Sequence, residues 1–353
     1  MLNHATPRAV IGHHGGHSNP AITKKGVNMK SRTLRVVITG ASSGIGAATA
    51  LAFARQGARL VLGARGHGGL EDIARRCQQA GGDADFGTVD VTDAAAVRAF
   101  AADARAALGG IDLWFSDVGI GVVGKYLDVP IADHQRVIET NLVSHMNDAH
   151  AVLPIFRAQG HGIWVNMISM GGFVATPWSA AYSASKFGLR GFSEALRGEL
   201  HAYPRIHVCD VYPTFVDTPG FAHAGNYSGA RLSYPPGVLA PEKVADAVVA
   251  LARRPRATTV VGAPTSALKL AELATPYGAV MMDRFLSAWS KRAERAPDTT
   301  GILYAPASGA SGIHSGQRLP GPPANTALVA GAALAGAMLG VELWRRARKD
   351  QAS

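Results

Sequence analysis

The feature that constrains this chain most is the alternation of short apolar runs with longer helix-like segments between residues 34 and 262. Runs such as Leu34–Thr39 are rich in β-branched residues, which is typical of strands buried on both faces of a parallel sheet. The helix-like segments often end at a glycine, such as Gly57 or Gly109. This alternation predicts βαβ units whose right-handed crossovers place helices on both faces of one sheet.

The expected strands lie at 34–39, 59–62, 86–89, 113–115, 162–168 and 206–212, and the expected helices at 47–56, 70–80, 93–108, 132–158, 180–201 and 241–253. They predict an α/β fold: a Rossmann-type, doubly wound parallel sheet in three α/β/α layers. We expect a single domain with a C-terminal helical extension.

Composition predicts how the rest of the chain is organised. The polar residues 1–33, punctuated by Gly and Pro, are expected to form a disordered tail. After it we expect a folded domain at 34–262 with a substrate lid at 214–240, a helical extension at 263–302, a Gly/Pro/Ser-rich linker at 303–325, an apolar helix at 326–344 and a basic tail at 345–353.

The formal net charge of +10 raises the question of an anionic partner. The basic residues are mostly scattered arginines, with no stripe of Lys and Arg between aromatics, so we expect no nucleic-acid partner. A basic surface also suits a cofactor that carries several phosphates. Cys77 and Cys209 have no disulfide or metal spacing, which predicts reduced thiols in a cytosolic protein and no metal site.

A glycine-rich turn joins the first expected strand to the first expected helix, with the sequence TGASSGIG. Gly40 permits a tight turn, Gly44 lets the backbone approach a diphosphate, and Gly46 lets the helix pack closely on the strand. The N-terminus of the helix offers free N–H groups and a partial positive charge to phosphate. The residues expected to bind a dinucleotide here are Gly40, Ser42, Ser43, Gly44, Ile45 and Gly46.

This glycine spacing resembles the cofactor loop of the short-chain dehydrogenase/reductase family, and the resemblance covers roughly residues 34–262. It implies a nicotinamide cofactor, hydride transfer to or from a small-molecule carbonyl or alcohol, and a homo-oligomer, either dimer or tetramer. In that family the oligomer commonly forms through the helices that carry its helix asparagine and its catalytic tyrosine.

The end of the second expected strand bears on the choice between NAD and NADP. An NAD site usually has an acidic residue there for the ribose 2′-hydroxyl, but this strand ends in Arg65, and no acid occurs before Glu71. Arg65 could instead bind a 2′-phosphate, so we expect NADP(H), although an ordinary exposed arginine is the alternative. Asp90 and Val91 resemble the family's adenine-contacting position, and a simple turn at Asp90 is the alternative.

The motif Tyr182-Ser-Ala-Ser-Lys186 is the strongest candidate for catalysis. Residues i and i+4 of a helix lie on one face, so the phenol and the ammonium can point into one cleft. A nearby cation is expected to lower the pKa of the phenol and make Tyr182 a general acid and base. Lys186 could also bind the nicotinamide ribose.

Two more residues complete the family's catalytic set. Ser169 lies at the end of an expected strand, thirteen residues before Tyr182, and would hydrogen bond the substrate oxygen. Asn141 matches the asparagine that holds a water next to the lysine, with a local helix kink or cap as the structural alternative.

Some positions depart from the family pattern. The segment Ser116-Asp117-Val118-Gly119 stands where the family has Asn-Asn-Ala-Gly, so that only Gly119 matches. Asp117 is expected to disturb cofactor affinity, whereas Thr218 matches the threonine near the carboxamide. The lid contains several aromatic residues, which favours a hydrophobic substrate, although it could simply pack on the domain.

The apolar run 326–344 would reach about 28 Å as a helix, near the thickness of the hydrocarbon layer. A spanning helix would carry the basic tail away from the cytosol, against the positive-inside tendency. Shallow membrane insertion with the tail on anionic headgroups avoids this conflict, and self-association of the helix is a further alternative.

Together these residues predict an NADP(H)-dependent oxidoreductase with a cytoplasmic catalytic domain. The main alternative outside enzymes is an NADP-binding sensor or scaffold without turnover, which the departure at Ser116-Asp117-Val118 keeps open. Epimerisation or dehydration on the same cofactor is another alternative, but it generally needs an expanded substrate domain. A nucleic-acid binder would rest on charge alone.

Overall fold

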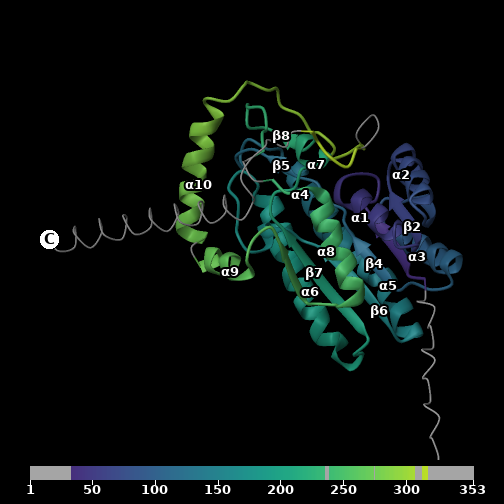
Figure 1. Ribbon diagram of the computed structural model, residues 1–353. Coiled ribbons are helices and arrows are strands. Elements are labelled where there is room, and N and C mark those ends of the chain that lie inside the picture. The colour runs from purple at the N-terminus through teal and green to yellow at the C-terminus, as the bar shows by residue number, and fades with distance from the viewer. Residues whose placement is uncertain (1–32, 235–237, 274, 307–311, 317–353) are drawn as a thin grey trace, which may run out of the picture. The chain divides into compact units, whose positions relative to one another are not determined.

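Seven parallel strands form the central sheet of the computed structural model, in the order β3-β2-β1-β4-β6-β7-β9 (Figure 1). Their bounds are β1 Arg35–Thr39, β2 Arg59–Ala64, β3 Asp83–Thr88, β4 Leu113–Ser116, β6 Gly162–Met167, β7 Ile206–Pro213 and β9 Thr258–Val261. The direction of winding reverses between β1 and β4, which makes the sheet doubly wound. The predicted Rossmann-type fold is confirmed.

The structure describes residues 33–234, 238–273, 275–306 and 312–316, which belong to one compact unit that begins at Thr33. The tail predicted at 1–33, apart from Thr33, lies outside the described residues. So do the apolar helix at 326–344 and the basic tail at 345–353. Within the described ranges, no helix combines the length and the apolar character needed to cross a bilayer.

Helices cover both faces of the sheet and create two hydrophobic cores. One core contains side chains of α1 (Gly44–Ala54), α2 (His67–Gln79) and α8 (Pro241–Arg253), and the other contains side chains of α3 (Ala94–Leu108), α5 (Ser144–Gln159) and α6 (Ala180–Glu199). Strand β1 serves both cores, because Val36 and Ile38 face the first and Val37 faces the second. This double burial explains why central strands such as β1 and β2 have almost continuously apolar sequences, whereas the edge strand β3 does not.

The segment predicted as one helix at 132–158 is helical throughout, but a π-helical turn interrupts its α-helical geometry. It consists of α4 (Ile131–Ile138), a π-helical turn (Glu139–Val143) and α5. The π turn contains Asn141, so the alternative of a local helix distortion is correct for this residue. Such turns recur at functional sites because they redirect a side chain out of the regular helical array.

Several short elements were not anticipated. Strands β5 (Val122–Val123) and β8 (Gly225–Asn226) form a separate parallel pair, and the predicted lid includes α7 (Pro219–Ala222). The helical extension predicted at 263–302 is helical only in α9 (Thr265–Leu273) and α10 (Thr275–Ser290). Beyond Ser290 the chain returns to β8, where Thr299 forms an antiparallel bridge with Asn226.

The linker predicted at 303–325 differs from the structure where the structure describes it. Leu303 is fully buried, and Ile313 is 9% exposed and belongs to the core that contains α1 and α8. A Gly/Pro/Ser-rich composition predicts a flexible segment. In the described part of this segment, however, Leu303 and Ile313 are buried against the folded unit, and burial of apolar side chains stabilises such packing.

A buried carboxylate joins the two central strands at the point where the winding reverses. Asp148 on α5 accepts hydrogen bonds from the hydroxyl of Thr39 at 2.6 Å and from that of Ser116 at 2.7 Å. Ser116 in turn accepts a hydrogen bond from the indole of Trp164 at 2.9 Å. Burial raises the pKa of Asp148 to about 6, and the hydrogen bonds from Thr39 and Ser116 oppose that rise.

Replacing Asp148 with alanine should lower the free energy of unfolding by about 1–3 kcal/mol, because two buried hydroxyls lose their acceptor. Asp148→Asn is the control that keeps an acceptor but carries no charge. Since the folded pKa is raised, stability from the neutral form is lost as pH rises through about 6. Urea titrations should therefore show the free energy of unfolding of the Asn variant rising relative to that of the wild type between about pH 4 and 7. A difference that does not change with pH would contradict this account.

Candidate active site

The glycine turn requires glycine for two separate reasons. Gly40 and Gly44 have positive φ angles of 83° and 56°, which favour residues without a Cβ. A Cβ added to Gly40 would lie 2.8 Å from the carbonyl of Asp117, and one added to Gly46 would lie 2.3 Å from the carbonyl oxygen of Gly40. The predicted turn is present, with α1 beginning at Gly44.

The N-terminus of α1 offers donors at the reversal point of the sheet. Ser43 occupies the N-cap position, but its hydroxyl makes no capping hydrogen bond. The N–H groups of a helix N-terminus and a hydroxyl at this place suit the phosphates of a dinucleotide. Thr218 closes one side, since its Cβ would lie 3.2 Å from a Cβ added to Gly44. In this respect the structure brings together the predicted glycine loop and Thr218.

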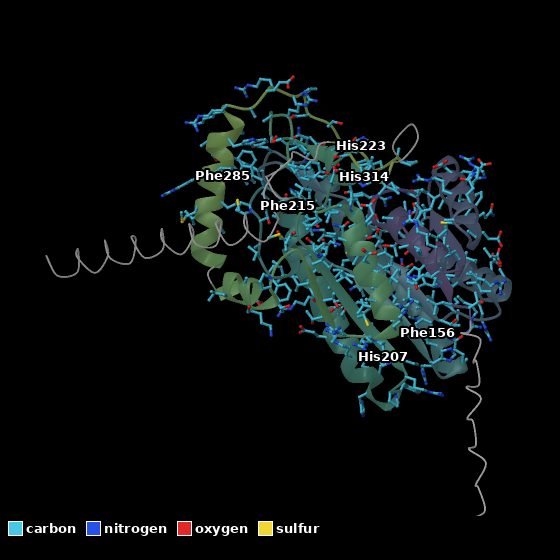
Figure 2. All side chains as sticks on the ribbon, in the orientation of Figure 1. Phe156, His207, Phe215, His223, Phe285 and His314 are labelled. Atoms are coloured by element: carbon cyan, nitrogen blue, oxygen red, sulfur yellow. The ribbon has the colours of Figure 1, made fainter. Side chains whose placement is uncertain are left out.

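Figure 2 shows the orientation of the sheet relative to this site. His207, at the start of β7, lies at the opposite end of the sheet from His223 and His314, which lie toward the ends of the strands that carry the candidate residues. In parallel α/β sheets, ligands bind outside these carboxyl ends.

Arg65 directly follows β2 and is partly buried. Its Nη2 donates a hydrogen bond to the carbonyl of Ile302 at 3.2 Å, while its buried Nη1 has no hydrogen-bond partner among the described residues. Burial lowers the pKa of Arg65, an effect that nearby Asp90 opposes. A buried guanidinium N–H without an acceptor is costly, and an anionic ligand would satisfy it.

The predicted adenine position has mixed support. The carboxylate of Asp90 accepts hydrogen bonds from the backbone N–H and the hydroxyl of Thr92, at 3.0 and 2.7 Å, so the turn that was its alternative is present. Val91 is buried, and its carbonyl accepts a hydrogen bond from Asn147 at 3.0 Å. Contact of either residue with an adenine ring stays a prediction.

Asp117 lies between the glycine turn and the candidate catalytic lysine. Its backbone N–H donates to the carbonyl of Thr39 at 3.0 Å, and its Oδ2 would lie 3.0 Å from a Cβ added to Gly46. Burial holds the pKa of Asp117 well above its usual range, although Lys186 and a hydrogen bond from the Gly46 backbone oppose the shift. A carboxylate in this place would repel a bound diphosphate whenever it is charged.

Ser169 and Tyr182 meet at the end of β6. Ser169 has φ 141° and ψ 161°, a conformation that non-glycine residues rarely adopt and that often marks an active site. Its hydroxyl accepts a hydrogen bond from the N–H of Gly171 at 3.2 Å and is also hydrogen bonded to the phenol of Tyr182. The two predicted residues are therefore adjacent.

The pKa of Tyr182 is raised in the structure, whereas the sequence predicted that it would be lowered. Burial raises the pKa of its phenol, and the hydrogen bond with Ser169 only partly offsets this effect. Lys186 does not lower the pKa as expected, because its ammonium lies 5.7 Å from the ring centroid and donates to the carbonyl of Met167 at 3.2 Å. Burial lowers the pKa of Lys186 itself to about 8, and Asp117 opposes this shift.

Asn141 is held rigidly beside Lys186. Its side-chain oxygen accepts from the N–H of Ile120 at 2.8 Å, and its amide nitrogen donates to the carbonyl of Ile120 at 2.9 Å and to the hydroxyl of Ser185 at 3.2 Å. A Cβ added to Gly119 would lie 3.8 Å from the Lys186 ammonium and 3.9 Å from the Asn141 oxygen. The predicted Gly119 therefore lies next to both polar groups.

The sequence interpretation missed two buried polar residues that support this arrangement. Nε2 of His145 donates to the carbonyl of Val118 at 2.8 Å, and Nδ1 of the same ring lies 2.5 Å from Oδ1 of Asn166. Asp148 joins β1 to β4. A signal was available, because Asn141, His145 and Asp148 follow one another at intervals of four and three residues, the spacing of one helix face. A polar stripe on a helix that must pack against a sheet indicates buried polar contacts.

Comparisons with known proteins give consistent results. Residues 34–226 match the family described as short chain dehydrogenase. The uncharacterized oxidoreductase YxnA of Bacillus subtilis is 30% identical over 255 residues, which cover 71% of this chain and 72% of the relative. The ketoacyl reductase HetN of a Nostoc species is 31% identical over 214 residues, covering 61% of this chain and 73% of the relative.

Solved structures agree with these matches. An alcohol dehydrogenase from the archaeon Thermococcus sibiricus, in complex with 5-hydroxy-NADP, has a TM-score of 0.57 and 27% identity, covering 65% of this chain and 96% of the other. A metagenomic short-chain oxidoreductase in complex with NADP has a TM-score of 0.55 and 29% identity, covering 65% and 97%.

Replacing Asp117 with asparagine should make NADPH binding less sensitive to pH. As pH rises through the raised pKa of the carboxyl, the wild type acquires a negative charge beside the phosphate-binding turn, and the asparagine variant does not. Calorimetric titrations at pH 6 and pH 9 should show a larger loss of affinity for the wild type than for Asp117→Asn. Asp117 raises the pKa of Lys186, so Lys186 loses its charge at a lower pH in Asp117→Asn, an effect that opposes the expected difference and cannot produce it. A loss of affinity that is equal in the two proteins, or larger in the variant, would contradict the prediction.

Proposed function

The chain belongs to the short-chain dehydrogenase family, whose members are NAD(P)-dependent oxidoreductases, and we propose that it transfers a hydride between NADP(H) and a carbonyl or alcohol group of a hydrophobic small molecule. The observation that carries this proposal is the convergence of Ser169, Tyr182, Lys186 and Asn141 beside the glycine turn. A sensor or scaffold that only binds NADP would not need a strained serine hydrogen bonded to a partly buried tyrosine.

The residues present fit NADP(H). The N-terminus of α1 and the hydroxyls of Ser42 and Ser43 would hold the diphosphate, with Ile45 and Thr218 beside it. The partnerless Nη1 of Arg65 supports a role in binding the 2′-phosphate, in a site with no acidic residue at the end of β2. The two similar solved structures contain NADP or 5-hydroxy-NADP, which favours the same cofactor here.

When bound, NADPH supplies a hydride to the carbonyl carbon of the substrate. Tyr182 then gives its phenolic proton to the oxygen that becomes an alcohol. Burial raises the pKa of this phenol, so the proton is retained until negative charge develops on the substrate oxygen. Ser169 would hydrogen bond the same oxygen and hold it within reach of Tyr182.

Lys186 and Asn141 would return the proton to Tyr182. The buried ammonium of Lys186 has a pKa of about 8, so it can release and recover a proton near neutral pH. A water beside Asn141 would link it to solvent, and the same residues would work in reverse when an alcohol is oxidised. Lys186 would also bind the nicotinamide ribose.

Aromatic residues near the site support a hydrophobic substrate. Phe221 and Tyr234, in the segment expected to form a lid, pack with ring centroids 4.7 Å apart, and Tyr234 donates to the carbonyl of Thr218 at 2.5 Å. Phe215 in the same segment is 46% exposed. We propose that these side chains cover an apolar ketone or alcohol, a class that also includes the ketoacyl groups named in the HetN relative.

We also propose a homo-oligomer and a cytoplasmic location. Val143 in the π turn, Met146 on α5 and Phe187 on α6 expose 38%, 41% and 36% of their surface, on the helices that form the family's oligomer contacts. Such exposed apolar side chains suit a contact between two copies.

Cys77 and Cys209 are free and buried, which agrees with the reducing compartment that we propose.

Replacing Tyr182 with phenylalanine should lower the rate of ketone reduction by about 100-fold or more, because a general acid typically contributes that factor. NADPH oxidation followed by absorbance, with a panel of aryl and medium-chain ketones, is the measurement. Tyr203→Phe, which removes a phenol outside the site, should keep wild-type rates. If a folded Tyr182→Phe protein kept its turnover, proton donation by Tyr182 would be refuted.

Replacing Arg65 with aspartate should shift cofactor preference from NADPH toward NADH. Loss of a charge-assisted hydrogen bond is worth about 1.5–3 kcal/mol, and repulsion of the 2′-phosphate adds to it. The ratio of the dissociation constants for NADPH and NADH, measured by fluorescence titration, tests this expectation. Arg98→Asp makes the same charge change on an exposed position of α3 and should leave the ratio unaltered. An unchanged ratio in Arg65→Asp would refute NADP selectivity through this residue.

A further inference from the structure

Two pieces of the C-terminal segment lie on the proposed cofactor site. We call residues 299–306 and 312–316 together the strap, which is the yellow end of the coloured trace in Figure 1. The first piece begins at β8, where Thr299 exchanges backbone hydrogen bonds with Asn226 at 2.8 and 3.0 Å. It then runs past Arg65, and the second piece reaches the N-terminus of α1.

The strap binds the two groups that NADP(H) needs. The carbonyl oxygen of Ile302 accepts a hydrogen bond from Nη2 of Arg65 at 3.2 Å, and Nη1 of the same guanidinium has no partner among the described residues. The carbonyl oxygen of Gly312 accepts a hydrogen bond from the N–H of Gly44 at 3.2 Å, in place of a diphosphate oxygen. One N–H of a helix N-terminus cannot give a full hydrogen bond to a carbonyl and to a phosphate at once. The strap and a bound diphosphate would therefore compete for the N–H of Gly44, and the strap also holds the Arg65 guanidinium that we propose for the 2′-phosphate.

The strap also approaches the predicted adenine position. Arg136 donates to the carbonyl of Leu303 at 3.1 Å and lies 3.9 Å from the carboxylate of Asp90. Contacts to Arg65, Arg136 and Gly44 thus follow the path from the adenosine to the diphosphate that the Rossmann-type arrangement predicts.

Anchors on both sides of this path hold the strap in place. Leu303 is fully buried, and the hydroxyl of Tyr304 donates to Asp133 at 2.7 Å. In the second piece, Ile313 is 9% exposed, and both the N–H and the hydroxyl of Ser315 donate to the buried Asp217. These contacts do not involve the groups proposed to bind the cofactor, so they can be weakened separately.

We propose that the strap is an intramolecular competitor of NADP(H), which must leave Gly44 and Arg65 before the cofactor can bind them. This inference rests on the proposed function, because it assumes that NADP(H) is the ligand of this site. The affinity measured for the cofactor is then the intrinsic affinity reduced by the free energy needed to displace the strap.

The test removes strap anchors without touching the cofactor groups. In the double variant Tyr304→Phe/Ser315→Ala two anchoring hydroxyls are lost, while Asp133 keeps its hydrogen bond from Tyr227 at 2.5 Å. NADPH should bind this variant more tightly, by about fivefold for each hydrogen bond lost. Tyr203→Phe/Ser290→Ala removes hydroxyls of the same kind outside the strap and should bind NADPH as the wild type does.

Hydrogen exchange of the full chain gives a second readout that does not depend on catalysis. The N–H groups of Ile302 and Leu303 donate to the carbonyls of His223 and Thr300, at 3.0 and 3.2 Å. If the strap leaves, NADPH should accelerate their exchange, as followed by mass spectrometry of the peptide that contains them.

Unchanged or weaker NADPH binding by the double variant, or slower exchange at Ile302 and Leu303 on adding NADPH, would overturn the proposal, since a strap that closes over the cofactor would behave in that way. Thermal denaturation should show that the variants are folded. If neither the wild type nor the double variant binds NADPH, the proposed function fails, and the strap inference fails with it. If both bind it equally, only the strap inference fails.

Discussion

The site depends on the hydrogen bonds through which Asp148 holds β1 and β4 together. Thr39 is the last residue of β1 and Ser116 the last of β4, so one carboxylate fixes both strand ends at the reversal point of the sheet. The glycine turn leaves from the first strand, and the segment with Asp117 and Gly119 leaves from the second. Both hydroxyls donate to the same carboxylate oxygen, Oδ2, whereas the buried Oδ1 has no hydrogen-bond partner among the described residues. The carboxylate therefore positions the two strand ends at some cost in stability.

Burial determines the acid–base properties of the proposed catalytic groups. Removal from water disfavours the charged form of each group, so it raises the pKa of Tyr182 and lowers that of Lys186 to about 8. The ordinary pKa values of the two groups, 10.0 and 10.5, are nearly equal, so these opposite shifts move their proton affinities apart. Tyr182 therefore holds its proton more tightly, and Lys186 releases its proton more readily. A neutral proton donor next to a lysine that can exchange protons suits the reduction of a carbonyl group.

The sequence predicted the features that follow from periodicity and from local motifs. Strands buried on two faces leave continuous apolar runs, and Tyr182 and Lys186 share a helix face, so both the sheet and the candidate catalytic pair could be predicted. The pair β5 and β8 was not, because two-residue strands carry no period. The hydrogen bonds of Asp148 depend on the relative positions of β1, β4 and α5, which no single segment encodes.

The pKa of Tyr182 and the docking of the strap show a second limit of prediction from sequence. The sequence reveals the charge next to a phenol but not its burial, and burial decides the direction of the shift. Likewise, Leu303 and Ile313 are single apolar residues in a polar, Gly-rich context, and their docking depends on cavities formed by distant elements.

The central claim is that hydride moves to a substrate whose oxygen receives its proton from Tyr182. The most direct measurement uses NADPH carrying deuterium at the transferable position of the nicotinamide, an accepted ketone, and mass spectrometry of the alcohol. The account predicts one deuterium on the carbinol carbon, and a rate reduced by the isotope. Oxidation of NADPH without deuterium in the alcohol would contradict it.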